Sequence, residues 1–356
     1  MGTFNAIITL TWKEVTKVSK FTLYNDDVVV AKFVFSHSVV TDFTPLKPEL
    51  LPMQIRHATA DGFTSWLRDR AVDLSNIQHR NLMNELIGSR DKATLAIRTH
   101  MFSISDTFTC FEGDEFIPRA ELCKPEDQNT ISDYFLVSSD TSLNKLQIVA
   151  TPNASTDGSF TKTWRFVDNE WWLYKLQSRE STDAEVTISR VLRDIGWDAA
   201  EYKRAGHYRT RVRTRNFLQP REFFEPYDSF RFYFDNPEEN EETIYMNIAS
   251  LGSSFEKSWK RILLADAVFV NTDRHMRNFG VIRSSETGKV LRLAPNYDNN
   301  QAYLANPSGT YSEGMLKLYM KTADQEDWQN LKTMSQAMTS YPYLRHAYEA
   351  TQKYLK

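Results

Sequence analysis

The segment VNTDRHMRNFGVI, residues 270–282, is the stretch of this sequence that decides the fold prediction. The residues before it predict an amphipathic helix, because apolar side chains recur there at helical spacing. These inward-facing residues are Phe255, Trp259, Ile262 and Leu263. We expect Ser253 and Glu256 to form a capping box where that helix begins. The polar segment that follows is therefore predicted to be a loop held by a packed helix.

Two residues of this loop suggest chemistry. Asp273 and Asn278 are five residues apart, the separation of Asp and Asn in the HRDxxxxN catalytic loop of protein kinases. In that loop the Asp receives the substrate proton and the Asn holds a magnesium ion. A DxxxxN pair also arises by chance in a polar turn, so this interpretation depends on further residues.

A second carboxylate is expected to return beside the loop. Residues 280–298, GVIRSSETGKVLRLAPNYD, read as two short strands joined by a turn and followed by Asp298. Asp298 would then take the metal-binding role of the Asp in the DFG motif, here flanked by Tyr297 and Asn299. The alternative is an ordinary turn aspartate.

A cation for the nucleotide phosphates is predicted at Lys175. This lysine lies in the apolar run WWLYKL, residues 171–176, where an unpaired ammonium would be unfavourable. The following segment, residues 183–196, has helical spacing, and Glu185 lies on its apolar face as the candidate partner. The alternative is a lysine that snorkels from a strand edge and a glutamate that favours a helix start.

A phosphate-covering loop is predicted before the strand KTWRFV, residues 162–167. Ser155, Gly158 and Lys162 lie in this turn-rich segment, which precedes the strand as such a loop does in kinases. One glycine is weak support, and a surface hairpin loop is the alternative.

Together these motifs resemble the HipA-like family of bacterial serine/threonine kinases over roughly residues 150–300. The family's catalytic loop DxHxxN is matched by DRHMRN, residues 273–278, and its phosphate loop S-x-x-G-x-x-x-K by STDGSFTK, residues 155–162. The resemblance implies ATP and Mg²⁺ as cofactors, Lys175 as the strand lysine and Asp298 as the second metal aspartate. It also implies Ser155 as an inhibitory autophosphorylation site and a DNA-binding antitoxin as a partner.

The predicted fold is α+β, a bilobal protein-kinase-like fold with an extra N-terminal strand-and-helix region. We expect a small β region at residues 1–50, a helical subdomain at 51–130, a kinase N-lobe at 131–220 and a mainly helical C-lobe at 221–356. Within the first region, an Asn-Asp-Asp turn joins two β-rich runs. The hinge between the lobes is expected near Asn216 and Leu218, which would also contact the nucleotide.

Composition excludes several classes of protein. With 41% hydrophobic and 25% charged residues, the chain is of the ordinary globular type. Its longest apolar run, residues 262–270, is interrupted by Asp266 and is too short to span a membrane. The first residues do not read as a secretion signal, so we expect a cytoplasmic protein. Cys110 and Cys123 suggest neither disulfides nor a zinc site.

The sequence leaves the choice of substrate open. The DRHxxN form is also similar to that of phosphoinositide kinases, so a lipid or small-molecule kinase is one alternative to a protein kinase. A catalytically inactive binding module is another, because an alternating set of arginines could contact nucleic acid. This set is Arg209, Arg211, Arg213 and Arg215, and a solvated strand face is its simpler explanation. The acidic residues 235–242 are predicted to form an exposed loop.

Overall fold

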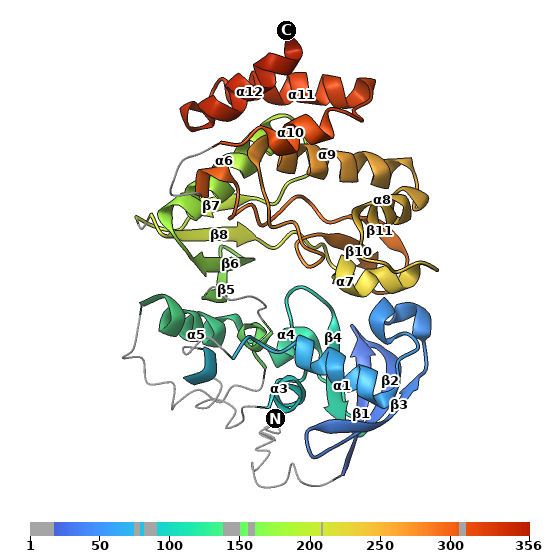
Figure 1. The fold of residues 1–356 in the computed structure, drawn as a ribbon. Helices are drawn as coiled ribbons and strands as arrows, with labels where there is room; N and C mark the ends of the chain where they lie inside the picture. Colours follow the sequence, from blue (N-terminus) through green and yellow to red (C-terminus); the bar gives the residue numbers. More distant parts are fainter. Residues whose placement is uncertain are drawn as a thin grey trace.

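The computed structural model describes residues 18–74, 79–81, 91–137, 150–155, 161–207, 209–305 and 311–356. Within these residues the strands form three antiparallel sheets, one in the N-terminal region and two in the rest of the chain. Figure 1 shows the N-terminal region at the bottom of the molecule and the last helices at the top. We use "N-terminal region" for the described residues up to position 122.

The N-terminal sheet has the strand order β3-β2-β1-β4. Its strands are β1 (Ser19–Asn25), β2 (Val28–Ser36), β3 (Val39–Pro45) and β4 (Phe108–Glu112). The predicted hairpin of β1 and β2 is confirmed. Its turn uses Asp26 at a φ of +53°, a left-handed conformation that Asp tolerates. The helical prediction for residues 51–130 missed β4, which pairs with β1 across more than eighty positions.

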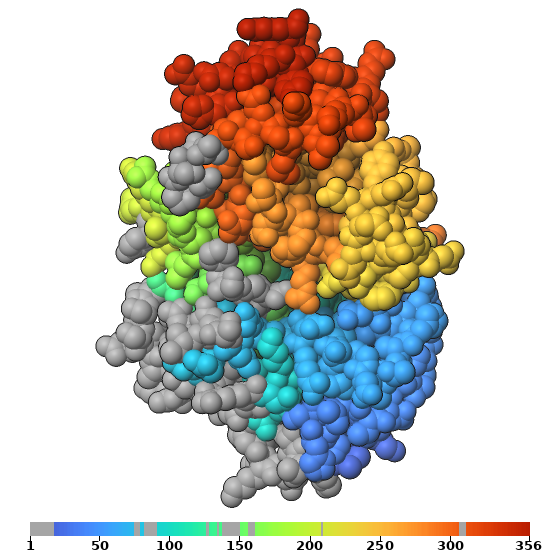
Figure 2. Space-filling view, viewed as in Figure 1, coloured from blue at the N-terminus to red at the C-terminus, as the bar shows by residue number. Residues whose placement is uncertain are grey.

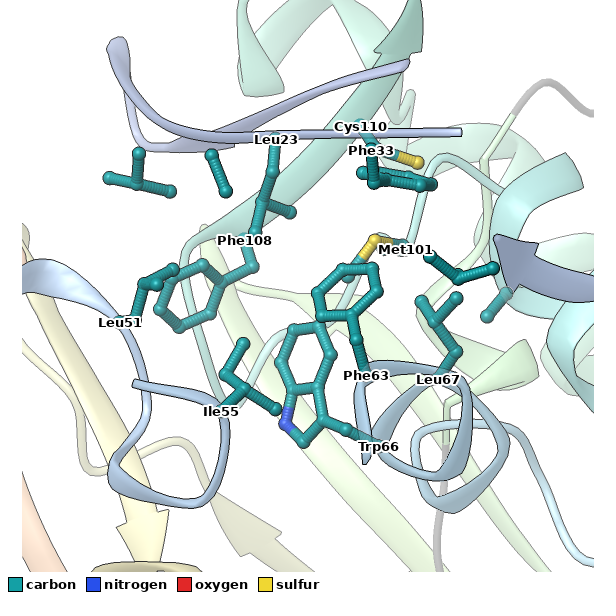
Figure 3. Close-up of a cluster of buried hydrophobic side chains, with 14 of the residues drawn as sticks. Leu23, Phe33, Leu51, Ile55, Phe63, Trp66, Leu67, Met101, Phe108 and Cys110 are labelled. Atoms are coloured by element: carbon teal, nitrogen blue, oxygen red, sulfur yellow. The ribbon is translucent and has the colours of Figure 1, made fainter. Parts of the chain in front are cut away.

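Two helices cover one face of this sheet. Helix α1 (Ala60–Asp69) begins where Thr59 accepts a hydrogen bond from the Gly62 N–H, and α3 (Lys92–Arg98) begins in the same way at Asp91. Figure 3 shows the core beneath them, in which the rings of Phe33, Phe63 and Trp66 lie close together. This arrangement explains why residues with helical spacing follow the first strands.

The second sheet has the order β5-β6-β8-β7, and helix α6 packs against it. The bounds are β5 (Lys162–Val167), β6 (Glu170–Leu176), β7 (Tyr202–Arg204), β8 (Arg211–Arg215) and α6 (Arg179–Asp194). Between the N-terminal sheet and this one lie the short helix α4 (Arg119–Leu122) and the longer α5 (Pro125–Val137). Strand β6 has a neighbouring strand on each side, and α6 packs against the same sheet. A side chain at the end of β6 can therefore be buried beneath α6.

The third sheet has the order β11-β10-β9 and lies beside the long helix α9. The bounds are β9 (Glu222–Pro226), α7 (Tyr227–Phe230), α8 (Glu241–Ser250), α9 (Ser253–Phe269), β10 (Gly280–Ser284) and β11 (Val290–Leu293). The predicted hairpin of β10 and β11 is confirmed. The chain ends in α10 (Gly314–Tyr319), α11 (Gln325–Met338) and α12 (Arg345–Leu355), which pack with α6 and α9.

Two local predictions are wrong. No capping box starts α9, because its N-cap is Gly252, whose φ of +129° suits glycine and which has no side chain to accept a hydrogen bond. The acidic loop is also shorter than predicted, since α8 begins at Glu241. Asn240 caps that helix, and acidic residues in a first turn interact favourably with the helix dipole.

Among the described residues, no helix combines the length and the apolar character needed to cross a membrane. Cys110 and Cys123 are both buried free thiols.

Candidate active site

Lys175 lies at the end of strand β6 and is almost fully buried. Its ammonium Nζ is 2.8 Å from Glu185 Oε1 and 2.8 Å from Asp298 Oδ1. The ion pair expected between Lys175 and Glu185 is therefore present, and Asp298 joins it. Because a buried ammonium is costly without partners, the two carboxylates define one position for the lysine.

Helix α6 positions Glu185 from behind this lysine. Ser178 caps the helix by accepting the Ser181 N–H at 3.0 Å. The side chain of Glu185 is fully buried on the apolar face of α6, and Gln177 Nε2 donates to its second oxygen at 2.9 Å. Burial raises the pKa of Glu185 to about 6, against the opposing charge of Lys175.

Asp298 is held through its backbone as well as through its carboxylate. Its φ of +58° lies in the left-handed region, which for a non-glycine residue costs about 1–3 kcal/mol. Its backbone N–H donates to the Tyr202 hydroxyl at 3.1 Å, and the buried Tyr202 ring lies 5.4 Å from the Lys175 ammonium. Sequence reasoning missed Tyr202, because one tyrosine on a short strand carries no pattern.

Charge at this cluster outweighs burial. Burial by itself would lower the pKa of Lys175, but Asp298 and Glu185 raise it above its ordinary value. Burial would likewise raise the pKa of Asp298, yet the charges of Lys175 and Lys162 hold that pKa below its ordinary value. At neutral pH Lys175 is therefore a cation and Asp298 a carboxylate anion.

Asp273 and Asn278 lie on the loop that follows α9. The helix ends at Phe269, and Val270 turns the chain with a left-handed φ of +53° that is unusual for a β-branched residue. Asn278 Nδ2 donates to the backbone carbonyl of Asp273 at 2.8 Å, which closes the loop. The side chain of Asn278 is buried, whereas Asp273 is half-buried.

Arg274 connects this loop to the segment that contains Asp298. Its guanidinium pairs with Asp266 at 2.9 Å, and its Nη1 donates to the carbonyls of Asn278 at 2.7 Å and Tyr297 at 2.6 Å. Sequence reasoning assigned no role to Arg274. The sequence contains one indication of such a cation: Asp266 lies inside an apolar helix, where a carboxylate requires a nearby positive charge.

A cavity of about 400 Å³ brings most of the predicted site residues together. The predicted residues in its lining are Ser155, Lys162, Lys175, Asn216, Leu218, Asp273, Asn278 and Asp298. Glu185 does not line it and contacts Lys175, which does. This volume lies within the range of small-molecule and cofactor sites.

The predicted phosphate loop is described only in part. The Ser155 hydroxyl donates to the carbonyls of Phe102 at 3.2 Å and Pro152 at 3.0 Å. Gly158 lies outside the described residues. Ser155 thus faces the cavity while its hydroxyl bonds to the N-terminal region and to its own turn.

The predicted hinge leads from β8 to β9. The Asn216 N–H donates to the Trp171 carbonyl at 2.9 Å, and Asn216 Oδ1 accepts the Leu218 N–H at 3.3 Å. Between them, the ring of Phe217 lies 6.0 Å from that of Tyr297. The segment therefore contacts both lobes at the edge of the cavity.

The residues of this cavity fit magnesium. Asp298 supplies an ionised carboxylate and Asn278 an amide, which are oxygen ligands of the type Mg²⁺ takes. Asn300 Oδ1 lines the same cavity and is buried without a hydrogen-bond partner among the described residues. In the part of the chain that the structure describes, no three His, Cys, Asp or Glu side chains group as a metal site. The set suits a metal ion that also binds phosphate oxygens and water.

The arginine face of β8 is occupied by the chain itself. Arg211 donates to the Leu136 carbonyl, Arg215 pairs with Glu170, and the Arg213 guanidinium lies 4.4 Å from the centre of the Trp172 ring. Arg209 lies outside the strand. His275 is exposed, and its Nδ1 accepts the Arg277 N–H at 3.2 Å within the same loop.

No protein-family model matches this sequence, and no curated protein matches it either. Several solved structures are similar to this chain. HipA of Shewanella oneidensis MR-1, from a toxin–antitoxin complex with HipB and operator DNA, has a TM-score of 0.59 at 11% identity over 93% of this chain and 95% of that chain. The proinflammatory kinase CtkA of Helicobacter pylori has a TM-score of 0.42 at 13% identity over 54% and 89%. The likeness to HipA confirms the predicted α+β kinase-like fold.

Proposed function

We propose that this protein is an ATP-dependent kinase that phosphorylates a serine or threonine of a protein substrate, with Mg²⁺ as cofactor. The observation that carries the proposal is the position of Lys175, 2.8 Å from both Glu185 and Asp298 in a cavity shared with Asp273 and Asn278. Phosphoryl transfer depends on a lysine so oriented, on a metal-binding aspartate and on a residue that receives the substrate proton.

Lys175 would bind the phosphates of ATP, and Glu185 would keep its ammonium in place. When bound, Mg²⁺ would neutralise charge on the phosphate oxygens, with Asn278 and Asp298 as its protein ligands. Arg274 would keep these two ligands at a constant separation, because it bonds to the backbone of both segments. Asn216 and Leu218 would contact the base.

Asp273 would act on the acceptor. As the hydroxyl oxygen of the acceptor bonds to the γ-phosphorus, its proton passes to the Asp273 carboxylate. The bond from the γ-phosphorus to the bridging oxygen breaks, and ADP leaves with that electron pair. The carboxylate of Asp273 suits this role because it has no ion-pair partner among the described residues.

Two further proposals follow from the resemblance to HipA-like kinases. Ser155 is proposed as an autophosphorylation site, since a phosphate there could not keep the hydroxyl's bonds to Phe102 and Pro152. An antitoxin is proposed as a partner, because the HipA structure contains HipB and operator DNA. Contact with nucleic acid would then be indirect, as the arginines of β8 already have partners within the chain.

The decisive experiment measures transfer of labelled γ-phosphate from magnesium-ATP to the protein itself and to a generic protein acceptor. We expect Asp273→Ala to lower transfer by about 10²–10⁴-fold, as removal of a positioned base does. Asp298→Asn should abolish transfer and weaken the effect of Mg²⁺ on ATP binding. Ser155→Ala tests whether Ser155 is the site of self-labelling.

Other outcomes separate the alternatives. Transfer to phosphoinositides in preference to proteins would indicate a lipid kinase. A wild-type protein that neither binds ATP nor transfers phosphate would refute the kinase function and support a binding module.

A further inference from the structure

The catalytic cavity has a second wall, which the N-terminal region supplies. Gln54, Trp66, Asp69, Arg70 and Asp106 line the same cavity as Asp273 and Asn278. In Figure 2 the blue surface of the N-terminal region meets the yellow and orange surface of the C-terminal half over a broad front. Residues far apart in the sequence therefore enclose one space.

A buried ion pair connects this wall to the described residues after position 122, which we call the catalytic half. Arg283, on the strand that follows the catalytic loop, is 2.6 Å from Glu225 and also donates to the carbonyls of Leu51 and Glu49, each at 2.9 Å. Glu225 in turn accepts the Met53 N–H at 2.6 Å. Both charged side chains are fully buried, so each depends on the contacts of the other.

Strand β9 adds a second connection. Phe223 belongs to the N-terminal hydrophobic core, where its ring lies 5.4 Å from that of Phe108. The next residue, Phe224, donates its backbone N–H to the Ser105 carbonyl at 2.9 Å. Since β9 also pairs with β10, the wall and the catalytic loop are held by the same two strands.

Some polar groups of the wall are already satisfied. Arg70 binds Asp106 at 2.5 Å and 3.0 Å, donates to the Met101 carbonyl at 2.7 Å and stacks on Trp66. Within the described residues, the side chains of Gln54 and Asp69 have neither a hydrogen bond nor an ion pair. The side chains of Gln54 and Asp69 are therefore available to bind a molecule that enters the cavity.

We propose that this wall binds the acceptor, and that the acceptor is an extended polypeptide segment with a basic residue beside its serine or threonine. The inference rests on the proposed kinase function. Gln54 carries both a donor and an acceptor, as a peptide group does, so it can bond to the backbone of the segment. Asp69 attracts a neighbouring cation and repels an acidic residue. The serine or threonine hydroxyl then lies toward Asp273.

The test uses two synthetic peptides with a central serine, one flanked by arginine and one by glutamate, at saturating magnesium-ATP. We expect wild-type kcat/KM to be about two- to fivefold higher for the arginine peptide, the ratio expected for one exposed ion pair. Asp69→Asn should remove this preference. Asp42→Asn is the matched control, because Asp42 is an exposed acid of the same region outside the cavity.

Gln54→Ala should raise KM for both peptides about fivefold and leave KM for ATP unchanged, as expected for one lost hydrogen bond. Equal melting temperatures of the variants would show that the wall is intact. The inference is overturned if Asp69→Asn keeps the wild-type preference, or if wild type binds magnesium-ATP and phosphorylates neither peptide. Absence of ATP binding would refute the kinase function itself, which a separate ATP-binding measurement detects.

Discussion

One hydroxyl, that of Tyr202, accepts the backbone N–H of Asp298 in its left-handed conformation. Tyr202→Phe removes only this oxygen and leaves the ring in place. We expect the Mg²⁺ concentration for half-maximal transfer to rise by about three- to tenfold, because a buried hydrogen bond contributes about 0.5–1.5 kcal/mol. Titration of activity with Mg²⁺ at saturating ATP measures the shift.

Tyr303→Phe is the control for this change. Tyr303 is buried too, and its hydroxyl donates to the Tyr343 carbonyl at 3.1 Å, away from the cavity lining. It should lower stability to a similar degree without affecting the Mg²⁺ titration. A shift of the titration in both variants would assign Tyr202 a general structural role.

If the proposed kinase function holds, the buried Glu185 should make ATP binding sensitive to pH. Its pKa of about 6 means that the carboxylate, which pairs with Lys175, dominates above pH 6 and is protonated below it. We expect kcat/KM for ATP to fall as the pH drops through about 6. A pH profile between 5 and 8, at constant ionic strength, measures this.

Glu185→Gln should give a lower and flatter profile of kcat/KM against pH, since no proton is then gained at this position.

The stability of the folded protein should change with pH in the opposite direction to kcat/KM. Between its ordinary pKa of 4.5 and about 6 the folded protein binds a proton that the unfolded chain releases, so the contribution of Glu185 to the free energy of unfolding decreases as pH rises. If the fall of kcat/KM at low pH is unchanged in Glu185→Gln, Glu185 is not the group that causes it.

At the scale of elements, the β10–β11 turn fits against the N-terminal region at Gly288. A Cβ atom there would lie 2.0 Å from the Glu49 carbonyl oxygen, and the φ of +69° already disfavours other residues. Gly288→Ala should therefore destabilise the protein by more than the roughly 1–2 kcal/mol of left-handed strain alone. Urea unfolding measures the difference.

Gly113→Ala is its matched control. Gly113 has a nearly equal φ of +66°, but a Cβ atom there would meet nothing within 4 Å. Gly113→Ala should therefore lose only the free energy of left-handed backbone strain, because its Cβ atom would overlap with no other atom. Equal losses in the two variants would mean that the turn does not press on the N-terminal region.

At the scale of the whole molecule, Phe223 joins the two halves. It lies on β9 of the catalytic half, yet it is buried in the core of the N-terminal region. Phe223→Ala should destabilise the protein by about 3–5 kcal/mol and release the N-terminal region first. Limited proteolysis followed by mass spectrometry would then show early cuts in residues 18–122.

Phe269→Ala provides the comparison, because Phe269 is equally buried and belongs to a core cluster whose members all lie in the catalytic half. It should lower stability by a similar amount without exposing the N-terminal region preferentially. The same cleavage pattern in both variants would contradict a connecting role for Phe223.

The sequence by itself determined several local elements and the residues proposed for the candidate site. The β10–β11 hairpin, helix α6 and the spacing of Asp273 and Asn278 could be predicted because each depends on residues close together in the chain. The start of α9 and the length of the acidic loop could not, since caps depend on the local backbone conformation. The pairing of Lys175 with Glu185 also followed from local burial.

Only the tertiary structure decided how distant segments meet. Lys175 and Asp298 are 123 positions apart, and Arg283 reaches the Glu49 carbonyl across 234 positions. No local pattern encodes such contacts, because their partners are selected by the packing of whole elements. The role of Tyr202, the connection through Arg274 and the second wall of the cavity arose in this way, from charges and polar groups that burial forces to find partners wherever the fold supplies them.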